Sequence, residues 1–257
     1  MNPIETFQQE CKDRIASYKN NKYFKALAAK FLQQSVSEKY SYNFTWLGRP
    51  IIQYPTDIVA MQEIIFETKP DLIIETGIAH GGSLIFSASM LALLNLCFPN
   101  EKAKRHVLGI DIEIRPHNKN AIMQHPLYKN LEMITMLQGS SISELTIAQV
   151  KDFVITGGYK KVLVCLDSMH THEHVLEELK GYSQLVSNDS YLVVFDTLIE
   201  NMPKNYYPDR PWDVGNNPMT AVKEFLQTEE GKAFEIKQEI FEKLQISVAE
   251  NGFLYKK

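Results

Sequence analysis

The 257-residue chain has few cysteines, and their positions exclude two kinds of small scaffold. Its three cysteines, Cys11, Cys97 and Cys165, are too few and too far apart for a disulfide framework or a structural zinc site. Cys97 and Cys165 lie inside apolar runs, where a cysteine is usually a small core residue. The chain therefore relies on an ordinary hydrophobic core, and free thiols suit a reducing compartment.

Long apolar runs and a signal sequence are also lacking. No stretch approaches the roughly 18 uncharged apolar residues that indicate a membrane helix. The start MNPIETFQQE has no basic segment followed by an apolar one. We therefore expect a cytoplasmic protein with no membrane partner.

Basic residues are in slight deficit, since 27 Lys+Arg stand against 31 Asp+Glu and the net charge is -4. A nucleic-acid surface needs a concentrated basic stripe, so we expect no nucleic-acid partner. With 44% apolar residues, the chain is long enough for one large α/β domain or two small ones. A homo-oligomer is compatible with this composition.

From Pro70 onward the chain alternates short apolar runs with helical patterns. The runs are DLIIETG, HVLGIDI, LEMITML, KVLVCLD and YLVVFDT. They show no polar alternation, as is typical of strands covered on both faces in a parallel sheet. Successive βα units of this kind predict an α/β fold with a doubly wound, Rossmann-like sheet.

The C-terminal part predicts further strands and a long loop. The segment LQISVAENGFLYKK predicts two strands joined by a turn at Asn251 and Gly252. The sheet is therefore expected to be seven-stranded and mostly parallel, with a C-terminal antiparallel hairpin. Residues 198–218 are rich in proline and aromatics, and we expect them to cover a ligand as a lid.

The N-terminal part predicts helices. Apolar residues recur at helical spacing in DRIASYKNNKYFKALAAKFLQQ. An ordered loop is expected over YSYNFTWLGRPIIQYP, then a helix over TDIVAMQEIIFETK, with Thr56 as its N-cap and Lys69 and Pro70 as its stop. We expect residues 1–66 to form a helical cap packed on a domain of residues 67–257.

In open α/β sheets the ligand lies beyond the carboxyl ends of the strands, so the residues that end each run are the candidates for a site. The first run ends in ETGIAHGGS, where Gly77, Gly81 and Gly82 allow a tight turn and a close approach of ligand to backbone. The spacing does not match the G-x-G-x-x-G dinucleotide fingerprint. An acid-x-G-x-x-x-G pattern starting at Glu75 is instead typical of nucleoside-binding methyltransferases, with the acid near the methionine amino group. A plain strand-to-helix turn explains one glycine but less easily all three.

The second and third runs also end in polar residues. Asp111 ends the second run, and an acceptor-only group there suits the two vicinal hydroxyls of a ribose. After the third run, Ser140 or Ser141 could meet an adenine edge. A helix N-cap explains either serine equally well.

The fourth and fifth runs end in Asp167 and Asp196, with His170 close behind the first. Oxygen ligands at neighbouring strand tips suit Mg²⁺. A histidine with an ordinary pKa of about 6.5 can remove a proton from a hydroxyl that the ion polarises. His170 and His174 could instead bridge a zinc ion from one helical face. For His172 and His174 the better interpretation is the beginning of an amphipathic helix.

Taken together, these motifs resemble one known family. The segments that carry the resemblance are ETGIAHGGS, GIDIEIRPHN, LDSMH with EHVLEELKGYSQLV after it, YLVVFDT and GNNPMTAVKEFL. From about Trp46 to the C-terminus the chain resembles the family named after cephalosporin hydroxylase, whose members look like class I S-adenosylmethionine methyltransferases. The name implies hydroxylation, but the α/β pattern shows no His-x-Asp/Glu triad of a non-haem iron oxygenase, so methyl transfer is the better interpretation.

The resemblance also implies roles at the strand tips. Related sugar O-methyltransferases imply that Asp167 binds the metal and that His170 is the base. They further imply a pair of acids at the end of the fifth strand, where this chain has Phe195 and Asp196. One of three expected ligands is thus replaced by an aromatic residue. The metal is expected to bind weakly, to recruit a substitute such as Glu200, or to be absent.

The resulting hypothesis is an S-adenosylmethionine-dependent O-methyltransferase that acts, with Mg²⁺, on a hydroxyl of a small-molecule sugar or secondary metabolite. The expected cofactor-binding residues are Glu75, Gly77, Gly81, Gly82, Ser83, Asp111, Ser140 and Asp167; the catalytic ones are Asp167 and His170, and the metal ligands Asp167 and Asp196. The alternative is a non-catalytic S-adenosylmethionine-binding subunit that assists a partner protein, for which the aromatic residue at position 195 is the sequence support. A nicotinamide oxidoreductase is disfavoured by the glycine spacing.

Overall fold

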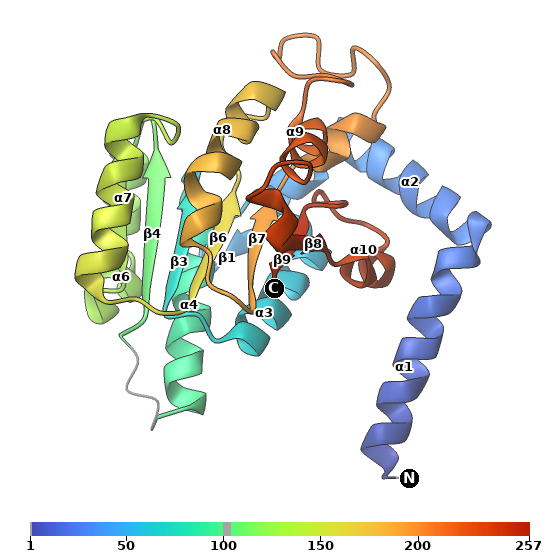
Figure 1. The fold of residues 1–257 in the computed structure, drawn as a ribbon, viewed down its shortest axis with the longest axis horizontal. Coiled ribbons are helices and arrows are strands. Elements are labelled where there is room, and N and C mark those ends of the chain that lie inside the picture. Colours follow the sequence, from blue (N-terminus) through green and yellow to red (C-terminus); the bar gives the residue numbers. More distant parts are fainter. Residues whose placement is uncertain (1, 100–103) are drawn as a thin grey trace.

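The computed structural model describes residues 2–99 and 104–257, and its centre is a seven-stranded sheet (Figure 1). The strand order is β5-β4-β3-β6-β7-β9-β8; the first five of these are parallel, and β9 is antiparallel to both β7 and β8. The strands are β3 (Leu72–Thr76), β4 (His106–Asp111), β5 (Ile134–Gln138), β6 (Val162–Leu166), β7 (Ser190–Val194), β8 (Phe234–Ile236) and β9 (Phe253–Lys256). The expected doubly wound, mostly parallel sheet of seven strands is confirmed.

Helices cover both faces of this sheet. Residues of α3, α4 and α5 join the hydrophobic cluster on one face, and residues of α7, α8 and α9 join the cluster on the other. The helices are α3 (Pro55–Thr68), α4 (Gly82–Cys97), α5 (Pro116–Gln124), α6 (Pro126–Leu131), α7 (Glu144–Gly157), α8 (His172–Tyr182), α9 (Pro218–Phe225) and α10 (Gln238–Leu244), with 3-10 turns at Tyr40–Asn43, Ser183–Leu185, Thr197–Asn201 and Gly231–Ala233. Among the described helices, none is both long and apolar enough to span a bilayer.

The residues of β3 alternate between the two helical layers. Ile73 belongs to the cluster with α3 and α4, whereas Leu72 and Ile74 belong to the opposite cluster. Because helices cover both faces, both sets of side chains are apolar, which explains the unbroken apolar run in the sequence. β3 lies between β4 and β6 and runs parallel to both, so the carboxyl ends of these strands meet at one edge.

The C-terminal antiparallel pair is present, but its first strand is not where the sequence predicts it. β9 pairs with β8, which precedes α10, and residues 245–250 form no strand. The turn at Asn251 and Gly252 leads into β9 without joining two strands. The physical reason lies in α3, because the hydroxyl of Ser247 donates to the buried carboxylate of Asp57 at 2.5 Å. This segment therefore binds the beginning of α3 and not a neighbouring strand.

The N-terminal helical pattern forms two helices, α1 (Pro3–Asn20) and α2 (Lys22–Ser37). Asn21 separates them, since its side chain accepts a hydrogen bond from the backbone N–H of Phe24 at 3.0 Å and caps α2. No residue of α1 is buried. Figure 1 shows α1, in dark blue, extending away from the sheet.

The sequence predicts a loop between α2 and α3, and the structure has there a short antiparallel pair, β1 (Thr45–Trp46) and β2 (Arg49–Pro50). The N-cap of α3 is Tyr54 and not Thr56. Thr56 lies inside the helix, where its hydroxyl donates to a carbonyl of the C-terminal segment. The helix ends at Lys69, as the sequence predicts, and Lys69 adopts a left-handed conformation there.

Candidate active site

Five parallel strands end at one edge of the sheet, and the candidate site is built at this edge. β3 passes into the glycine turn, residues 77–82, which leads into α4. The neighbouring β4 ends in Asp111, and β6 and β7 lead directly to Asp167 and Asp196. The parallel order thus brings together candidate residues from four separate parts of the chain.

The glycines of the turn are required by the packing of the protein itself. Gly77 and Gly81 have φ angles of 88° and 79°, a region that glycine alone adopts readily. A Cβ on Gly77 would lie 2.0 Å from the carbonyl oxygen of Asp167, and a Cβ on Gly82 would lie 2.1 Å from that of Pro50. The sequence explains these glycines by a tight turn and the approach of a ligand, but neighbouring backbone already requires Gly77 and Gly82, and the side chain of Ile122 lies where a Cβ on Gly81 would be.

Two side chains brace the glycine turn. Arg49 donates from Nε to the carbonyl of His80 at 3.0 Å, and Asn118 donates from its amide to the carbonyl of Ala79 at 2.9 Å. Ala79 has a φ of 45°, which costs a non-glycine residue energy and persists where the surroundings enforce it. Asn118 belongs to the R-P-H-N motif that carries the family resemblance, and here it supports the turn.

Asp111 lies against the glycine turn, but backbone groups occupy most of its carboxylate. Oδ2 accepts from the N–H groups of Ile78 and Ala79 at 2.8 and 3.3 Å, and Oδ1 accepts from Glu113 at 3.0 Å. A carboxylate offers about four lone-pair sites. Asp111 can therefore accept one ribose hydroxyl without losing a backbone bond, and its predicted role in holding two stays a prediction.

Glu75 lies at the end of β3 and is 4% exposed. The Ser83 hydroxyl, at the beginning of α4, donates to its Oε1. Burial raises the pKa of Glu75 from 4.5 to about 8, and the bond from Ser83 opposes that shift. A cationic ligand group beside Glu75 would therefore stabilise its ionised form.

The loop after β5 does not use its first two serines as helix caps. Ser143 caps α7, since its hydroxyl oxygen accepts from the backbone N–H of Thr146 at 3.2 Å. Ser141 instead lies with Oγ 3.1 Å from Nε2 of His174, and Ser140 is half-buried in the loop. Contact of Ser140 with an adenine stays a prediction.

The histidines at the beginning of α8 contact protein groups, not one another. Nε2 of His172 lies 3.1 Å from Oε2 of Glu224, and Nε2 of His174 lies 3.2 Å from Oγ of Ser168. Nε2 of His170 lies 3.1 Å from Oδ2 of Asp196, which follows β7. The interpretation of His172 and His174 as helix-opening residues therefore fits the structure better than a zinc bridge.

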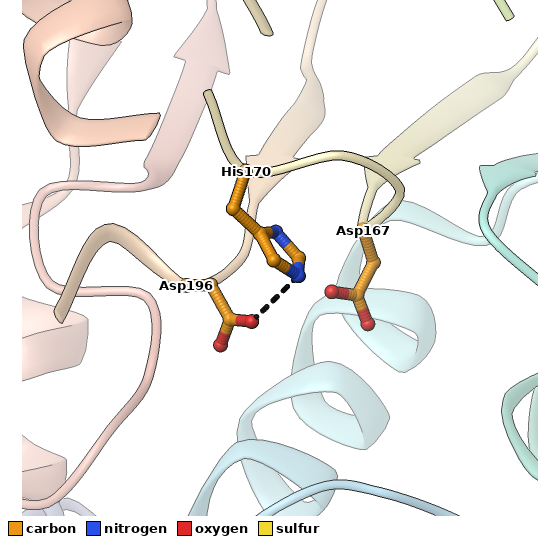
Figure 2. A group of neighbouring side chains, drawn as sticks. All are labelled: Asp167, His170 and Asp196. Carbon is orange, nitrogen blue, oxygen red and sulfur yellow. Dashed lines mark ion pairs between the residues drawn. The ribbon is translucent and has the colours of Figure 1, made fainter. Parts of the chain in front are cut away.

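Asp167, His170 and Asp196 form one cluster, hereafter the strand-tip cluster (Figure 2). One ligand-capable atom from each of the three lies within 4.8 Å of the others. Nε2 of His170 is 3.1 Å from Oδ2 of Asp196, and both carboxylates point toward the imidazole (Figure 2). The indole of Trp212, from the expected lid, packs edge to face on the His170 ring at 4.7 Å.

The strand-tip cluster is electrostatically unfavourable without a cation. Burial, and then the charge of Asp196, raise the pKa of Asp167 well above its ordinary value, and Glu75 and Glu178 add to the effect. A divalent cation between the two aspartates would reverse it. Two carboxylates at neighbouring strand tips are hard oxygen donors, so this donor set fits Mg²⁺ or a similar ion that keeps several waters.

The position expected to supply a third carboxylate is apolar and buried. Phe195 is 6% exposed and belongs to the hydrophobic cluster with α3 and α4. Glu200, the suggested substitute, accepts hydrogen bonds from the backbone N–H of Gly215 at 2.8 Å and the amide of Asn217 at 2.6 Å. Glu200 therefore joins the two ends of the 198–218 segment. It is not a member of the strand-tip cluster.

One residue at this site, Gln53, does not lie at the end of a strand of the parallel sheet. Gln53 precedes α3, and its Nε2 donates to Oδ2 of Asp167 at 3.2 Å. These residues are 114 positions apart. Gln53 stands in a loop, where no local pattern marks it, so sequence reasoning missed it.

The doubly wound sheet, the glycine turn after its first parallel strand and the acidic residues at the next strand tips are the features that the resemblance to S-adenosylmethionine-dependent methyltransferases implies. Residues 38–257 match the model of the family described as rhamnosyl O-methyltransferase/CmcI. The chain belongs to this family. The resemblance to the cephalosporin hydroxylase family is confirmed, as is the prediction of an S-adenosylmethionine-dependent O-methyltransferase.

Curated relatives carry the same name. The rhamnosyl O-methyltransferase of Mycobacterium leprae is 27% identical over 215 residues, which are 83% of each chain. That of Mycobacterium tuberculosis is 28% identical over 211 residues, which are 82% of this chain and 77% of the relative.

Solved structures of CmcI share the fold. The apo structure has a TM-score of 0.58 and 17% identity, covering 84% of this chain and 76% of that one. A structure of CmcI with magnesium and S-adenosylmethionine has a TM-score of 0.52 and 14% identity, covering 84% and 77%.

Proposed function

We propose that the protein transfers a methyl group from S-adenosylmethionine to a hydroxyl of a sugar or sugar-bearing secondary metabolite, with a divalent cation at the acceptor oxygen. The observation that carries this proposal is the strand-tip cluster beside the glycine turn, in a chain of the rhamnosyl O-methyltransferase/CmcI family. The names of the curated relatives support a sugar acceptor.

The cofactor would lie across the ends of β3 and β4. Glu75 is the candidate partner of its methionine ammonium, because a buried carboxylate is stabilised by a cation. Asp111 would accept a ribose hydroxyl, and the N-terminus of α4 would face the methionine carboxylate. The full proposed set is Glu75, Gly77, Gly81, Gly82, Ser83, Asp111, Ser140 and Asp167.

Asp167 and Asp196 would hold the metal. Two unit charges about 5 Å apart repel by roughly 3 kcal/mol at an effective dielectric constant of about 20, which a divalent cation relieves. When bound, the ion supplies Lewis-acid polarisation of the acceptor hydroxyl. Because Phe195 is buried and apolar, Asp167 and Asp196 would be the carboxylates that hold the ion, and Mg²⁺ readily keeps waters as its other ligands.

His170 would be the general base. The methyl carbon forms a bond to the acceptor oxygen as its bond to the sulfonium sulfur breaks, and S-adenosylhomocysteine leaves as a neutral thioether. The hydroxyl proton passes to the His170 imidazole, whose positive charge the Asp196 carboxylate at 3.1 Å stabilises. The Trp212 indole, in T-shaped contact with the His170 ring, restricts rotation of that ring, so the base is oriented before the acceptor arrives.

The proposal is tested by methyl transfer from methyl-labelled S-adenosylmethionine to a panel of rhamnosyl and other sugar acceptors with Mg²⁺. We expect label in the acceptor, and we expect His170→Ala to abolish transfer while S-adenosylhomocysteine affinity stays unchanged, because the base contacts only the acceptor. His172→Ala, two residues away and outside the strand-tip cluster, is the matched control and should retain turnover. Turnover by His170→Ala at the wild-type rate would contradict the assigned base.

The alternative expected from the sequence, a non-catalytic cofactor-binding subunit, is supported by the buried aromatic residue at position 195 but disfavoured by the family match. It predicts S-adenosylhomocysteine binding without label transfer to any acceptor in the panel. Transfer to one acceptor excludes it.

A further inference from the structure

Gln53 has a buried carbonyl oxygen with no partner. The side chain is 8% exposed, and its Nε2 donates to Asp167. Oε1 is one of a few buried side-chain oxygens without a hydrogen bond in the described part of the chain. Buried polar atoms are normally satisfied, so an orphaned acceptor beside a candidate site points to a ligand that donates to it.

The surroundings of Gln53 specify what that donor carries. Gln53 lines a cavity together with Glu75, Ser83 and Asp167, and apolar side chains such as Phe86 complete its wall. Three carboxylates, including Asp57, contribute to this lining, and none of the described lining residues is basic. The cavity therefore suits a cation that donates hydrogen bonds and is attached to a short apolar chain.

The amide orientation distinguishes an ammonium from a metal ion. The nitrogen of the Gln53 amide faces the Asp167 carboxylate at 3.2 Å, because a carboxylate oxygen accepts and an amide nitrogen donates. The amide oxygen is left for a donor elsewhere in the cavity. An ammonium group has three N–H donors and can bond to Glu75 and Gln53 at once.

Gln53 is also held rigidly enough to position a ligand. The segment before it packs on the beginning of α4, where the Pro50 carbonyl oxygen lies 2.1 Å from the point that a Gly82 Cβ would occupy. After it, the hydroxyl of Tyr54 lies 2.7 Å from that of Ser35 in α2. The flank before Gln53 is therefore held against the glycine turn, and the flank after it is held against α2.

We propose that Gln53 is a cofactor-positioning residue, whose carbonyl oxygen accepts a hydrogen bond from the methionine ammonium of S-adenosylmethionine while its amide nitrogen holds the Asp167 carboxylate. This inference rests on the proposed function. It links the cofactor to the metal side of the site, because one amide contacts both.

The test compares ligands that differ at the ammonium. Isothermal titration measures binding of S-adenosylhomocysteine, of its analogue without the α-amino group, and of 5′-methylthioadenosine to wild type, Gln53→Leu and Gln53→Glu. Gln53→Leu should weaken S-adenosylhomocysteine about tenfold or more, because a hydrogen bond to a charged group is lost. It should change affinity for the two ligands without the ammonium by less than about twofold. Gln53→Glu keeps an acceptor for the ammonium but loses the N–H that donates to Asp167, so it should bind S-adenosylhomocysteine more tightly than Gln53→Leu but less tightly than wild type.

Gln33→Leu makes the same substitution at an exposed position and controls for the change of residue type. Equal losses for all three ligands, or no loss for S-adenosylhomocysteine, would overturn the role of Gln53. So would a loss in Gln53→Glu as large as in Gln53→Leu. A fall in Mn²⁺ affinity of Gln53→Leu without any change in S-adenosylhomocysteine affinity would make the oxygen a metal ligand and also overturn it. Failure of the wild-type protein to bind S-adenosylhomocysteine contradicts the proposed function itself.

Discussion

At the scale of single residues, the aspartates at the strand ends differ in whether backbone or side-chain groups contact their carboxylates. Three backbone N–H groups hold the carboxylate of Asp111. Asp167 and Asp196 are contacted by side chains, Gln53 and His170 respectively. Backbone groups of a turn move little, whereas side chains rearrange more easily. The Asp111 carboxylate is therefore fixed to the glycine turn, whereas those of Asp167 and Asp196 can adjust to a metal or substrate.

Glu75 predicts a pH dependence of stability. Its pKa is about 8 in the folded protein against 4.5 ordinarily, so the folded state keeps the proton to higher pH than the unfolded state. The free energy of unfolding therefore falls as pH rises from about 4.5 to about 8 and is unaffected by this group below that window. Glu75→Gln should remove roughly 2–4 kcal/mol of that fall. Urea unfolding of both proteins at pH 5 and pH 8 measures the difference; parallel pH curves would contradict the assigned cause.

The position of Phe195 next to Asp196 predicts that a carboxylate at residue 195 would increase metal affinity. Phe195→Glu adds a carboxylate next to Asp196, so Mn²⁺ should bind at least about tenfold more tightly than to wild type. The same change places a charge in the hydrophobic cluster, and the metal-free variant should be less stable. Electron paramagnetic resonance of free Mn²⁺ gives the affinity. Phe195→Leu is the matched control, and unchanged affinity in Phe195→Glu would place residue 195 away from the metal.

At the scale of elements, the strand-to-helix turn carries more constraint than its length suggests. Its backbone lies against the segment after β6, against β2 and against α5. A turn fixed by three separate elements keeps its shape before any ligand binds. This rigidity favours binding, because little conformational entropy remains to be lost.

Comparison of Gly77 in this turn with Gly158, which ends α7 with a similar φ angle, separates backbone strain from steric crowding. Gly77 and Gly158 have φ angles of 88° and 70°, but an added Cβ would clash only at Gly77, next to the Asp167 carbonyl. Gly158→Ala should cost about 1 kcal/mol of unfolding free energy from strain alone. Gly77→Ala should cost roughly 2–4 kcal/mol, since it adds overpacking. Equal losses in chemical denaturation would show that crowding at Gly77 is relieved by relaxation.

At the scale of the whole molecule, we propose that the N-terminal helices and the sheet form one folding unit, as the sequence predicts for residues 1–66. The three helices of this region differ in how much of their surface is buried against the rest of the protein. α1 has no buried residue, whereas α2 buries Ala28 and Ser35 and meets Tyr54 through the Ser35 hydroxyl. α3 contributes to the main hydrophobic cluster.

Truncations test this proposal. Removal of residues 1–20 should change the free energy of unfolding by about 1 kcal/mol or less, because exposed contacts contribute little. Removal of residues 1–37 should cost roughly 2–4 kcal/mol, because buried contacts and a buried hydrogen bond are lost. Urea unfolding with cofactor binding as a second readout measures both. If the protein without residues 1–37 were as stable as the full chain, the helical cap would be a separate unit.

The sequence by itself determined the fold class and most candidate residues of the site. Strands buried on both faces must be apolar throughout, so runs such as 72–76 are visible without any alignment. Parallel strands end at one edge, so the residues after them, Asp111, Asp167 and Asp196, could be named before the structure was known. The family resemblance was readable because these same short segments carry it.

Only the tertiary structure decided how those residues are supported. The contact of Gln53 with Asp167 and the bracing of the glycine turn by Asn118 join residues that are 114 and 39 positions apart in the chain. The C-terminal strand pairing also depends on distant residues. The segment 245–250, expected to be a strand, is bound by Asp57 of α3. Local patterns encode which backbone conformation a segment prefers. They do not encode which distant side chain packs against it, because that depends on how all the elements fill the space around the sheet.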